Sequence, residues 1–299
     1  ADIIGTDNRF TPLWSASFRW NAMRENFLKD VNFISDLAIR LSYGYTGNID
    51  RSSYPIPMIF LSGYRYDENF VAESVTFPNP NIKWERKQDR NFGLDFGFWD
   101  NRIGGSFNYY WNTGKDLLGT MTTPESYGRT SIKANVSSIE NTGWEFNVNL
   151  RLDLGANVRW INSFNIAQNT NKIKKTYLKD LNELNVMGGS DNIEGYASGS
   201  MFGYRFAGVN PLTGQAMIYL TDESRKILAD YRGVDISQVA DKIDTEEIDY
   251  NIREELLRAS MEKLGSVTPK VTGGFSSTLT WKKLEVRASF AYSAGHLLE

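Results

Sequence analysis

The clearest pattern along the chain is a run from Trp144 to Asp153 in which apolar and polar residues alternate strictly. Alternate residues of a β-strand point to opposite faces, whereas a helix would mix the two sets around its surface. At about 3.3 Å per residue the run spans roughly 33 Å, which on a strand tilted by about 45° matches the hydrocarbon core of a bilayer. The run therefore predicts a strand whose apolar face meets either a protein core or lipid.

Seven further segments alternate in the same way. They lie at residues 13–20, 37–46, 92–98, 103–111, 158–166, 271–281 and 284–292. Asn162 interrupts the apolar face of one of them. Short connections at 21–35, 99–101, 153–157 and 282–283 alternate along the chain with long ones at 47–85, 114–139 and 170–269. We therefore expect eight antiparallel strands, with the short connections at one end of the sheet and the long ones at the other.

This sorting of the connections favours a transmembrane β-barrel over a soluble β-sandwich. Outer-membrane barrels have short periplasmic turns and long extracellular loops, and a sandwich has no reason to separate the two kinds. Trp20, Trp99 and Trp281 all lie beside short turns, where an aromatic girdle would meet the membrane surface. The predicted fold class is all-β: an antiparallel transmembrane barrel segment of about eight strands, part of a larger barrel.

In a barrel the polar face of each strand would line the lumen. A sandwich would instead turn the same charges to outer solvent. An arginine at the lipid midplane costs about 2 to 4 kcal/mol, so the strand charges belong on the polar side. The predicted lumen-facing residues are Arg19, Arg40, Asp95, Glu145, Arg151, Arg159, Glu285 and Arg287.

The connection at 170–269 reads as an acidic, soluble loop module. Residues 222–264 hold twelve acidic and seven basic side chains, a net charge of −5. A short β-like piece is expected from Met201 to Tyr219, around a turn at residues 210–214. A helix is expected from Thr245 to Leu264, opened by a capping-box pattern at Asp244 and Glu247. Its apolar stripe would comprise Ile248, Ile252, Leu256 and Leu257.

Composition excludes several classes of function. The formal charge of −3 shows no nucleic-acid footprint, the chain has no cysteine, and it has a single histidine, His296. A group of five carboxylates matches no calcium loop and fits the start of the expected helix. Those residues are Asp241, Asp244, Glu246, Glu247 and Asp249. We expect no catalytic residue, no metal and no cofactor.

Four stretches together resemble the SusC-like, or starch-utilisation-type, branch of the TonB-dependent outer-membrane transporters. They are Asn79–Glu85 followed by the hairpin Asn91–Ile103, then Ser138–Phe146, Pro269–Phe275 and Leu41–Asn48. Their order and spacing carry the resemblance across most of the chain.

The resemblance implies a large single-chain barrel in the bacterial outer membrane that imports a bulky nutrient, an oligosaccharide or a peptide. It also implies two partners: the TonB complex, reached through an N-terminal plug, and a SusD-like lipoprotein at the extracellular mouth. This sequence shows no export signal, plug or final strands, so we expect residues 1–299 to be a later-middle part of such a barrel, with 170–269 as an extracellular loop module.

Aromatic residues of the long loops are the candidate ligand contacts, because they could stack on sugar rings or peptide groups. Trp84 belongs to a strand-flanking motif and is expected to be structural. The other candidates are Tyr54, Tyr64, Tyr66, Tyr127, Tyr196 and Tyr204. The leading hypothesis is transport, not enzymatic activity, and the alternative is a soluble, surface-exposed β-sandwich that binds glycans.

Overall fold

The computed structural model describes residues 10–28, 30–48, 58–62, 71–76, 79, 81–124, 126, 131–155, 157–176 and 193–297. These residues form two separately packed units. One holds the described residues up to 176 together with 193–198 and 269–295, and the other holds 199–268 with the last described residues, 296–297.

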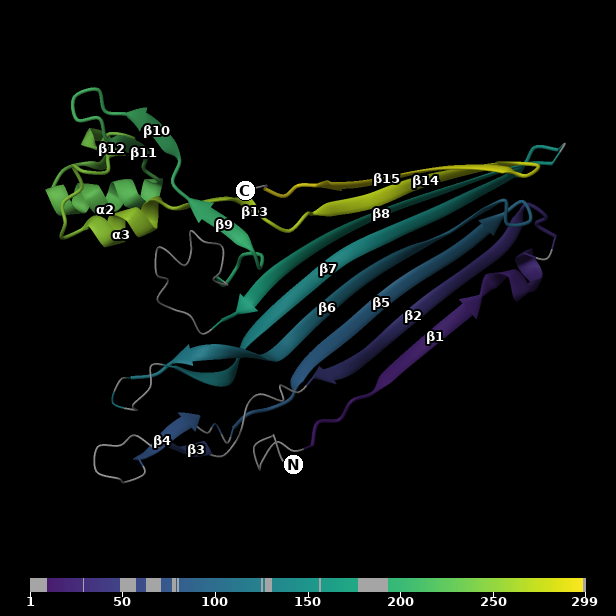
Figure 1. Cartoon of the computed structure of the whole chain (residues 1–299), viewed down its shortest axis with the longest axis horizontal. Helices are drawn as coiled ribbons and strands as arrows, with labels where there is room; N and C mark the ends of the chain where they lie inside the picture. The colour runs from purple at the N-terminus through teal and green to yellow at the C-terminus, as the bar shows by residue number, and fades with distance from the viewer. Residues whose placement is uncertain are drawn as a thin grey trace. The chain divides into compact units, whose positions relative to one another are not determined.

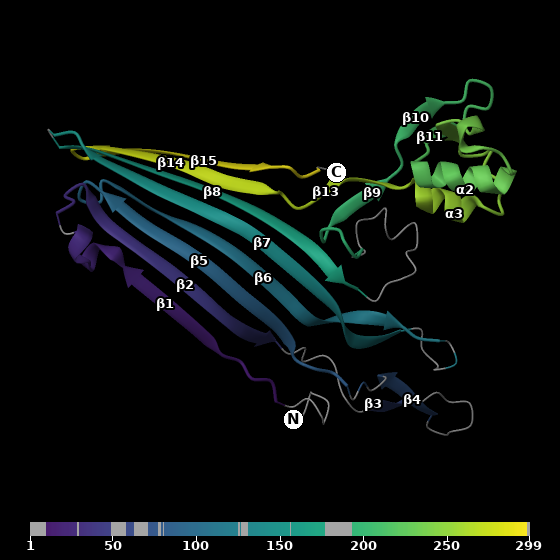
Figure 2. The same cartoon turned by 180° about the vertical axis from the view of Figure 1, so that it is seen from behind.

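A single antiparallel sheet of eight strands makes up most of the first unit (Figure 1). The strands follow one another in chain order, in the arrangement β1-β2-β5-β6-β7-β8-β14-β15. Their bounds are β1 Ser15–Asn21, β2 Ile34–Asn48, β5 Glu85–Phe98, β6 Ile103–Thr122, β7 Ser131–Asp153, β8 Val158–Lys175, β14 Val271–Trp281 and β15 Leu284–Ala294. All eight predicted strands are confirmed, and Figure 2 shows the same up-and-down path from behind.

The strand register keeps the two kinds of side chain on separate faces. Directly paired residues of neighbouring strands share a face. One row pairs Phe18 with Leu41, Leu41 with Phe92, and Phe92 with Tyr109. Asn162 lies on this apolar face, opposite Leu150 and Ser277, and does not interrupt β8.

The apolar face is open to its surroundings. Phe18 is 61% exposed and Phe290 is 65% exposed, at opposite edges of the sheet. A soluble sandwich would cover such residues with a second sheet, and the described residues contain none packed there. The described residues also contain no helix long and apolar enough to cross a membrane.

Short connections lie at one end of the sheet, as predicted. Three of them turn through left-handed backbone: Trp99, Asp100 and Asn101 have φ between 50° and 58°, Gly155 and Asn157 have φ 78° and 63°, and Lys282 has φ 54°. The connection between β1 and β2 holds two 3₁₀ helices, η2 (Ala22–Arg24) and η3 (Asn26–Leu28). The Trp20 indole Nε1 donates to the Glu25 carboxylate at 3.0 Å, which ties this connection to the end of β1.

The expectation of a loop at 114–139 was wrong. There β6 continues to Thr122 and β7 begins at Ser131, so the strands extend beyond the alternating segments. A bulge hides the pattern, because the register shifts between Gly114 and Leu117, and Asp116 has φ 56°. The connection at 47–85 contains a small hairpin, β3 (Met58–Ser62) with β4 (Val71–Thr76), and ends where β5 begins at Glu85.

The second unit is a small α/β module. It contains β9 (Ser200–Gly203), β10 (Phe206–Val209), β11 (Ala216–Tyr219), α2 (Asp222–Arg232), η5 (Ile236–Gln238), β12 (Lys242–Asp244), α3 (Arg253–Ser260) and β13 (Glu262–Ser266). Its strands form two sheets, β10-β11-β12 and β13-β9. The predicted β-like piece at 201–219 is confirmed. Leu256, which is fully buried, lies in a core that also includes Leu228 and Ile218.

The expected helix Thr245–Leu264 is only partly right. The helix α3 spans Arg253–Ser260, and residues 245–252 form turns instead. The capping box fails because the Asp244 side chain is buried at the end of β12 and bonds to a neighbouring turn. All four residues of the predicted stripe are buried in the core, as expected. The sequence reasoning missed α2, although Thr221 caps its start and Gly233, with φ 64°, ends it.

Candidate functional site: the polar face of the sheet

The eight strand charges singled out from the sequence share one face. Arg19 pairs with Arg40, Asp153 with Arg159, and Thr278 with Arg287. Alternation along each strand places the others on the same side. This face is opposite the row of Phe18, Leu41 and Phe92.

Arg40 is at the centre of one ionic cluster on this face. Its Nη2 donates to the Asp95 carboxylate at 2.8 Å and to the Asn108 amide oxygen at 3.0 Å. Arg19 approaches the same carboxylate at 3.3 Å. Gly93 leaves the space that the guanidinium occupies, since an added Cβ would come within 3.0 Å of it. The cluster therefore links β1, β2, β5 and β6.

A second cluster lies towards the short connections. The Asp153 carboxylate accepts hydrogen bonds from Arg159 Nε at 3.0 Å and Arg151 Nε at 3.2 Å. Arg287 donates to Thr278 at 3.2 Å and lies 3.8 Å from Glu285. These side chains are about half exposed, so each pair contributes little to stability. Their effect is to give the face a hydrated, charged surface.

A polar groove of about 300 Å³ lies on the same strands as the second cluster but further from the short connections. The side chains that line it on this face are those of Glu145, Asn147, Asn165, Ala167 and Thr272, from β7, β8 and β14. The Glu145 carboxylate forms no hydrogen bond or ion pair with another described residue. A carboxylate, two carboxamides and a hydroxyl can accept and donate hydrogen bonds to peptide or sugar groups.

Sequence reasoning identified Glu145 and its polar row but not the groove. Asn165 and Thr272 had no signal of their own, because an isolated Asn or Thr in an alternating strand looks like any other polar position. The pairing of the strands identifies them, because Asn147 pairs with Asn165 and Ala167 pairs with Thr272. Only the order of the strands brings these residues together.

The predicted aromatic ligand contacts are mostly outside the described residues. Tyr54, Tyr64, Tyr66 and Tyr127 fall there. Tyr196 is 40% exposed, and its backbone carbonyl accepts from Ile173 N at 2.8 Å, next to the end of β8. Tyr204 packs against the core of the second unit.

The motif Asn79–Glu85 fastens the start of β5 to its neighbours. The Asn135 side chain exchanges two hydrogen bonds with the backbone of Lys83, at 2.8 and 2.9 Å. The Glu85 carboxylate accepts from Leu118 N at 2.8 Å, and Asn79 donates to the Lys133 carbonyl at 2.8 Å. These contacts support the structural role expected of the motif, in which Trp84 is partly buried.

The carboxylate group at 241–249 has a structural role in the second unit. Asp244 accepts from Asn210 Nδ2 at 2.9 Å, Thr213 Oγ1 at 2.8 Å and Glu246 N at 2.9 Å. These bonds, the Glu246 amide first, hold the pKa of Asp244 below its usual range. The helix-start interpretation was therefore wrong. The described residues contain no group of three or more His, Cys, Asp or Glu placed to hold a metal ion.

Comparison with known proteins gives a consistent picture. The family described as "TonB dependent receptor-like, beta-barrel" matches residues 3–247. TonB-dependent receptor P3 of Formosa agariphila is 31% identical over 97% of this chain and 28% of its own length. TonB-dependent receptor SusC of Bacteroides thetaiotaomicron is 35% identical over 56% of this chain and 18% of its own.

A solved structure is similar over nearly the whole chain. The RagAB peptide importer in its "closed-closed" state matches with a TM-score of 0.80 and 26% identity, over 98% of this chain and 30% of that one. The chain thus spans less than a third of the length of the relatives named here.

Proposed function

Because the chain belongs to the TonB-dependent receptor-like β-barrel family, we propose that the protein imports a nutrient across the bacterial outer membrane, with energy supplied through TonB. The eight-stranded sheet is a segment of such a barrel. Members of this family are transporters, not enzymes. The main support for the proposal is that the sheet has one exposed apolar face and one charged face, because a barrel wall between lipid and water requires both.

In this proposal the apolar face meets lipid and the polar face lines the lumen. The register supports the assignment, because the eight strand charges share the second face. The short connections would be periplasmic and the long ones extracellular, which supports placing Trp20, Trp99 and Trp281 in the periplasmic aromatic girdle. Each of these tryptophans is more than a third exposed, as contact with a membrane interface requires.

The nutrient we propose is an oligosaccharide or a peptide. The polar groove at Glu145, Asn147, Asn165 and Thr272 would bind it through hydrogen bonds, and loop aromatics such as Tyr196 would stack on it. Peptides are the first class to test, because the similar RagAB structures are of a peptide importer. A SusD-like lipoprotein is the partner proposed for the extracellular mouth, and the RagAB and SusC relatives support a two-protein system.

The test uses a strain in which this protein is the only route for the nutrient. Uptake of labelled peptides and oligosaccharides is measured with and without an active TonB complex, and membranes are extracted with carbonate. We expect the protein to remain in the outer-membrane fraction and uptake of one nutrient class to require TonB. Recovery in the soluble periplasm, or uptake that is equal without TonB, would contradict the proposal.

A variant at the groove tests the ligand assignment separately. Glu145→Gln keeps the size of the side chain and removes its charge, so we expect assembly to be normal and the affinity for the imported nutrient to fall. Glu285→Gln is the control, because Glu285 lies on the same face but outside the groove. Equal uptake by the two variants would remove Glu145 from the ligand path.

A further inference from the structure

Arg90 lies where the apolar face of β5 gives way to polar residues: Phe92 follows it on this face, and Gln88 and Arg86 precede it. Its register partner on β2 is Tyr43, and the next residue of β5 on this face is Phe92, which pairs with Leu41. A charge on a lipid-facing row is costly unless the side chain reaches a polar group at the edge of the hydrocarbon. The position of Arg90 therefore requires an explanation.

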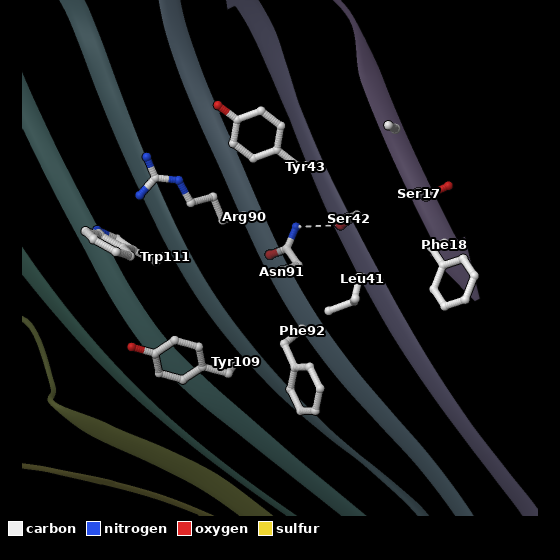
Figure 3. Close-up of a pocket in the computed structure, with 11 residues that line it drawn as sticks. Ser17, Phe18, Leu41, Ser42, Tyr43, Arg90, Asn91, Phe92, Tyr109 and Trp111 are labelled. Atoms are coloured by element: carbon white, nitrogen blue, oxygen red, sulfur yellow. Dashed lines mark hydrogen bonds between the residues drawn. The ribbon is translucent and has the colours of Figure 1, made fainter. Parts of the chain in front are cut away.

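The guanidinium of Arg90 is held in place by an aromatic ring and not by a carboxylate. Its central carbon lies 4.5 Å from the centroid of the Trp111 ring on β6. Figure 3 shows the side chain extending towards Trp111, with Tyr43 on its other side. Arg90 forms no ion pair with any described residue. Stacking orients an arginine and leaves its N–H groups free to donate.

An apolar groove leads up to this cation. It has a volume of about 500 Å³ and runs across β1, β2, β5 and β6. Phe18, Leu41, Phe92 and Tyr109 line it, and Figure 3 shows them spread across neighbouring strands, with Phe18 furthest from Arg90. Their exposed fractions run from 37% to 61%, so the groove is open along its length.

A second cation lies further along the same face. Arg86 and Lys115 are register partners, and Arg86 shares this face with Arg90 because the two are four residues apart on β5. The charge of Arg86 is matched by Asp116 at 2.7 Å. Lys115 is exposed and has no ion pair among the described residues. Glu140, which hydrogen-bonds with Trp111 on this face, is matched by Lys174 at 3.2 Å. Arg90 and Lys115 therefore leave the surface next to the groove positive.

We propose that this face binds a membrane lipid with a phosphate headgroup. An acyl chain lies in the groove of Phe18, Leu41, Phe92 and Tyr109, and the phosphate accepts hydrogen bonds from Arg90. A planar guanidinium can donate two parallel bonds to a phosphate, and basic pockets on membrane-facing surfaces are suited to such headgroups. The inference rests on the proposed contact of this face with a membrane but not on transport.

Native mass spectrometry of the intact protein in detergent tests the proposal. The probes are phosphatidic acid and a diacylglycerol with the same acyl chains. Arg90→Gln should weaken phosphatidic acid binding about five- to tenfold, as expected for loss of a charge-assisted pair, and leave diacylglycerol binding unchanged. Lys87→Gln is the matched control, since it removes a charge from the opposite face of the same strand and should change neither.

Two further variants keep the test decisive whether or not Arg90→Gln assembles. Arg90→Lys keeps the charge and should retain more phosphatidic acid binding than Arg90→Gln. Leu41→Trp fills the groove but keeps the charge of Arg90, and it should weaken binding of both lipids several-fold. Unchanged phosphatidic acid binding in Arg90→Gln or Leu41→Trp would overturn the proposal, as would equal losses for the two lipids in Arg90→Gln. Displacement of phosphatidic acid by millimolar inorganic phosphate would point to a free-phosphate site instead and would also overturn it.

Discussion

At the scale of single residues, two glycines explain two of the four sequence motifs. Gly143 pairs with Tyr110 across β6 and β7, and Gly273 pairs with Tyr292 across β14 and β15. In both places an added Cβ would overlap the tyrosine ring and a carbonyl oxygen of the next strand. The Tyr110 hydroxyl then reaches Asn169 at 3.0 Å. Each glycine makes room for a tyrosine that lies across its own strand.

Gly273→Ala should therefore destabilise the sheet by about 1–3 kcal/mol, the usual cost of overpacking. The backbone carbonyl of Asn165, which an added Cβ would overlap, cannot move aside without disturbing β8. Gly104→Ala is the control, because its Cβ would meet only a carbonyl oxygen at 3.8 Å. Urea unfolding of the intact protein in lipid vesicles measures both. Equal midpoints for the two variants would refute the steric explanation.

Val148 and Asn147 are neighbours on β7 whose side chains lie on opposite faces of the sheet, so substitutions at these two residues test the faces separately. Val148 pairs with Gly105 and Phe164 on the apolar face, and Asn147 pairs with Ser106 and Asn165 on the polar face. Val148→Arg should cost about 2–4 kcal/mol if the apolar face meets the middle of a bilayer, and Asn147→Arg should cost far less. The yield of folded, heat-modifiable protein in outer membranes is the measurement. Similar yields would contradict the orientation of the sheet.

At the scale of elements, hydrogen bonds and ion pairs determine the positions of bulges and turns, which the alternation of apolar and polar residues does not predict. The bulge at Asp116 extends the β6–β7 hairpin, because the displaced carboxylate pairs with Arg86 at 2.7 Å and the Asp116 carbonyl accepts from Asn135 at 2.6 Å. In the second unit, Asn210 and Thr213 of the turn at 210–214 both donate hydrogen bonds to the carboxylate of Asp244, which belongs to β12. In each case one acidic residue ties a turn or bulge to a strand that is distant in sequence.

Asp244 gives the second unit a defined response to pH. Its pKa is depressed in the folded protein, so its contribution to stability is present above the unfolded value of about 3.9 and is lost as the pH falls through that value towards the folded pKa. We expect amides of β11 and β12 to lose protection from hydrogen exchange, corrected for intrinsic rates, between about pH 5 and pH 3.

Asp244→Asn separates this effect from other carboxylates. Asp249, whose pKa is lowered mainly by the Tyr231 hydroxyl, contributes in the same direction and remains in the variant. The variant should be less protected than the wild type near pH 6 and should show a weaker dependence on pH. An unchanged pH dependence would exclude Asp244 as a source of it.

At the scale of the whole molecule, the exposed apolar face sets how the chain behaves in water. A contiguous patch that includes Phe18, Phe290 and Trp281, each more than half exposed, far exceeds what soluble monomers tolerate. Residues 1–299 expressed alone should aggregate in plain buffer and become dispersed in detergent, as measured by size-exclusion chromatography. A monodisperse, folded species in buffer would favour the sandwich alternative and contradict a barrel segment.

The sequence by itself determined the strands and their two faces. Alternation is local, so the eight strands, the short turns and the polar rows could all be read from the chain, and the motifs pointed to the family. The Thr245–Leu264 helix was predicted too long because its acidic start satisfies a capping pattern that the buried Asp244 overrides. A carboxylate bonded to Asn210 and Thr213 cannot also cap a helix.

Only the tertiary structure decided which residues from different strands lie side by side. The groove at Glu145 and the apolar groove at Arg90 each combine residues that are far apart in sequence, and their membership follows from register and strand order. The same holds for Arg40, which meets Asp95 and Asn108 only because Gly93 leaves space between them. Alternation fixes the face on which a side chain lies, whereas hydrogen bonding between strands fixes its neighbours.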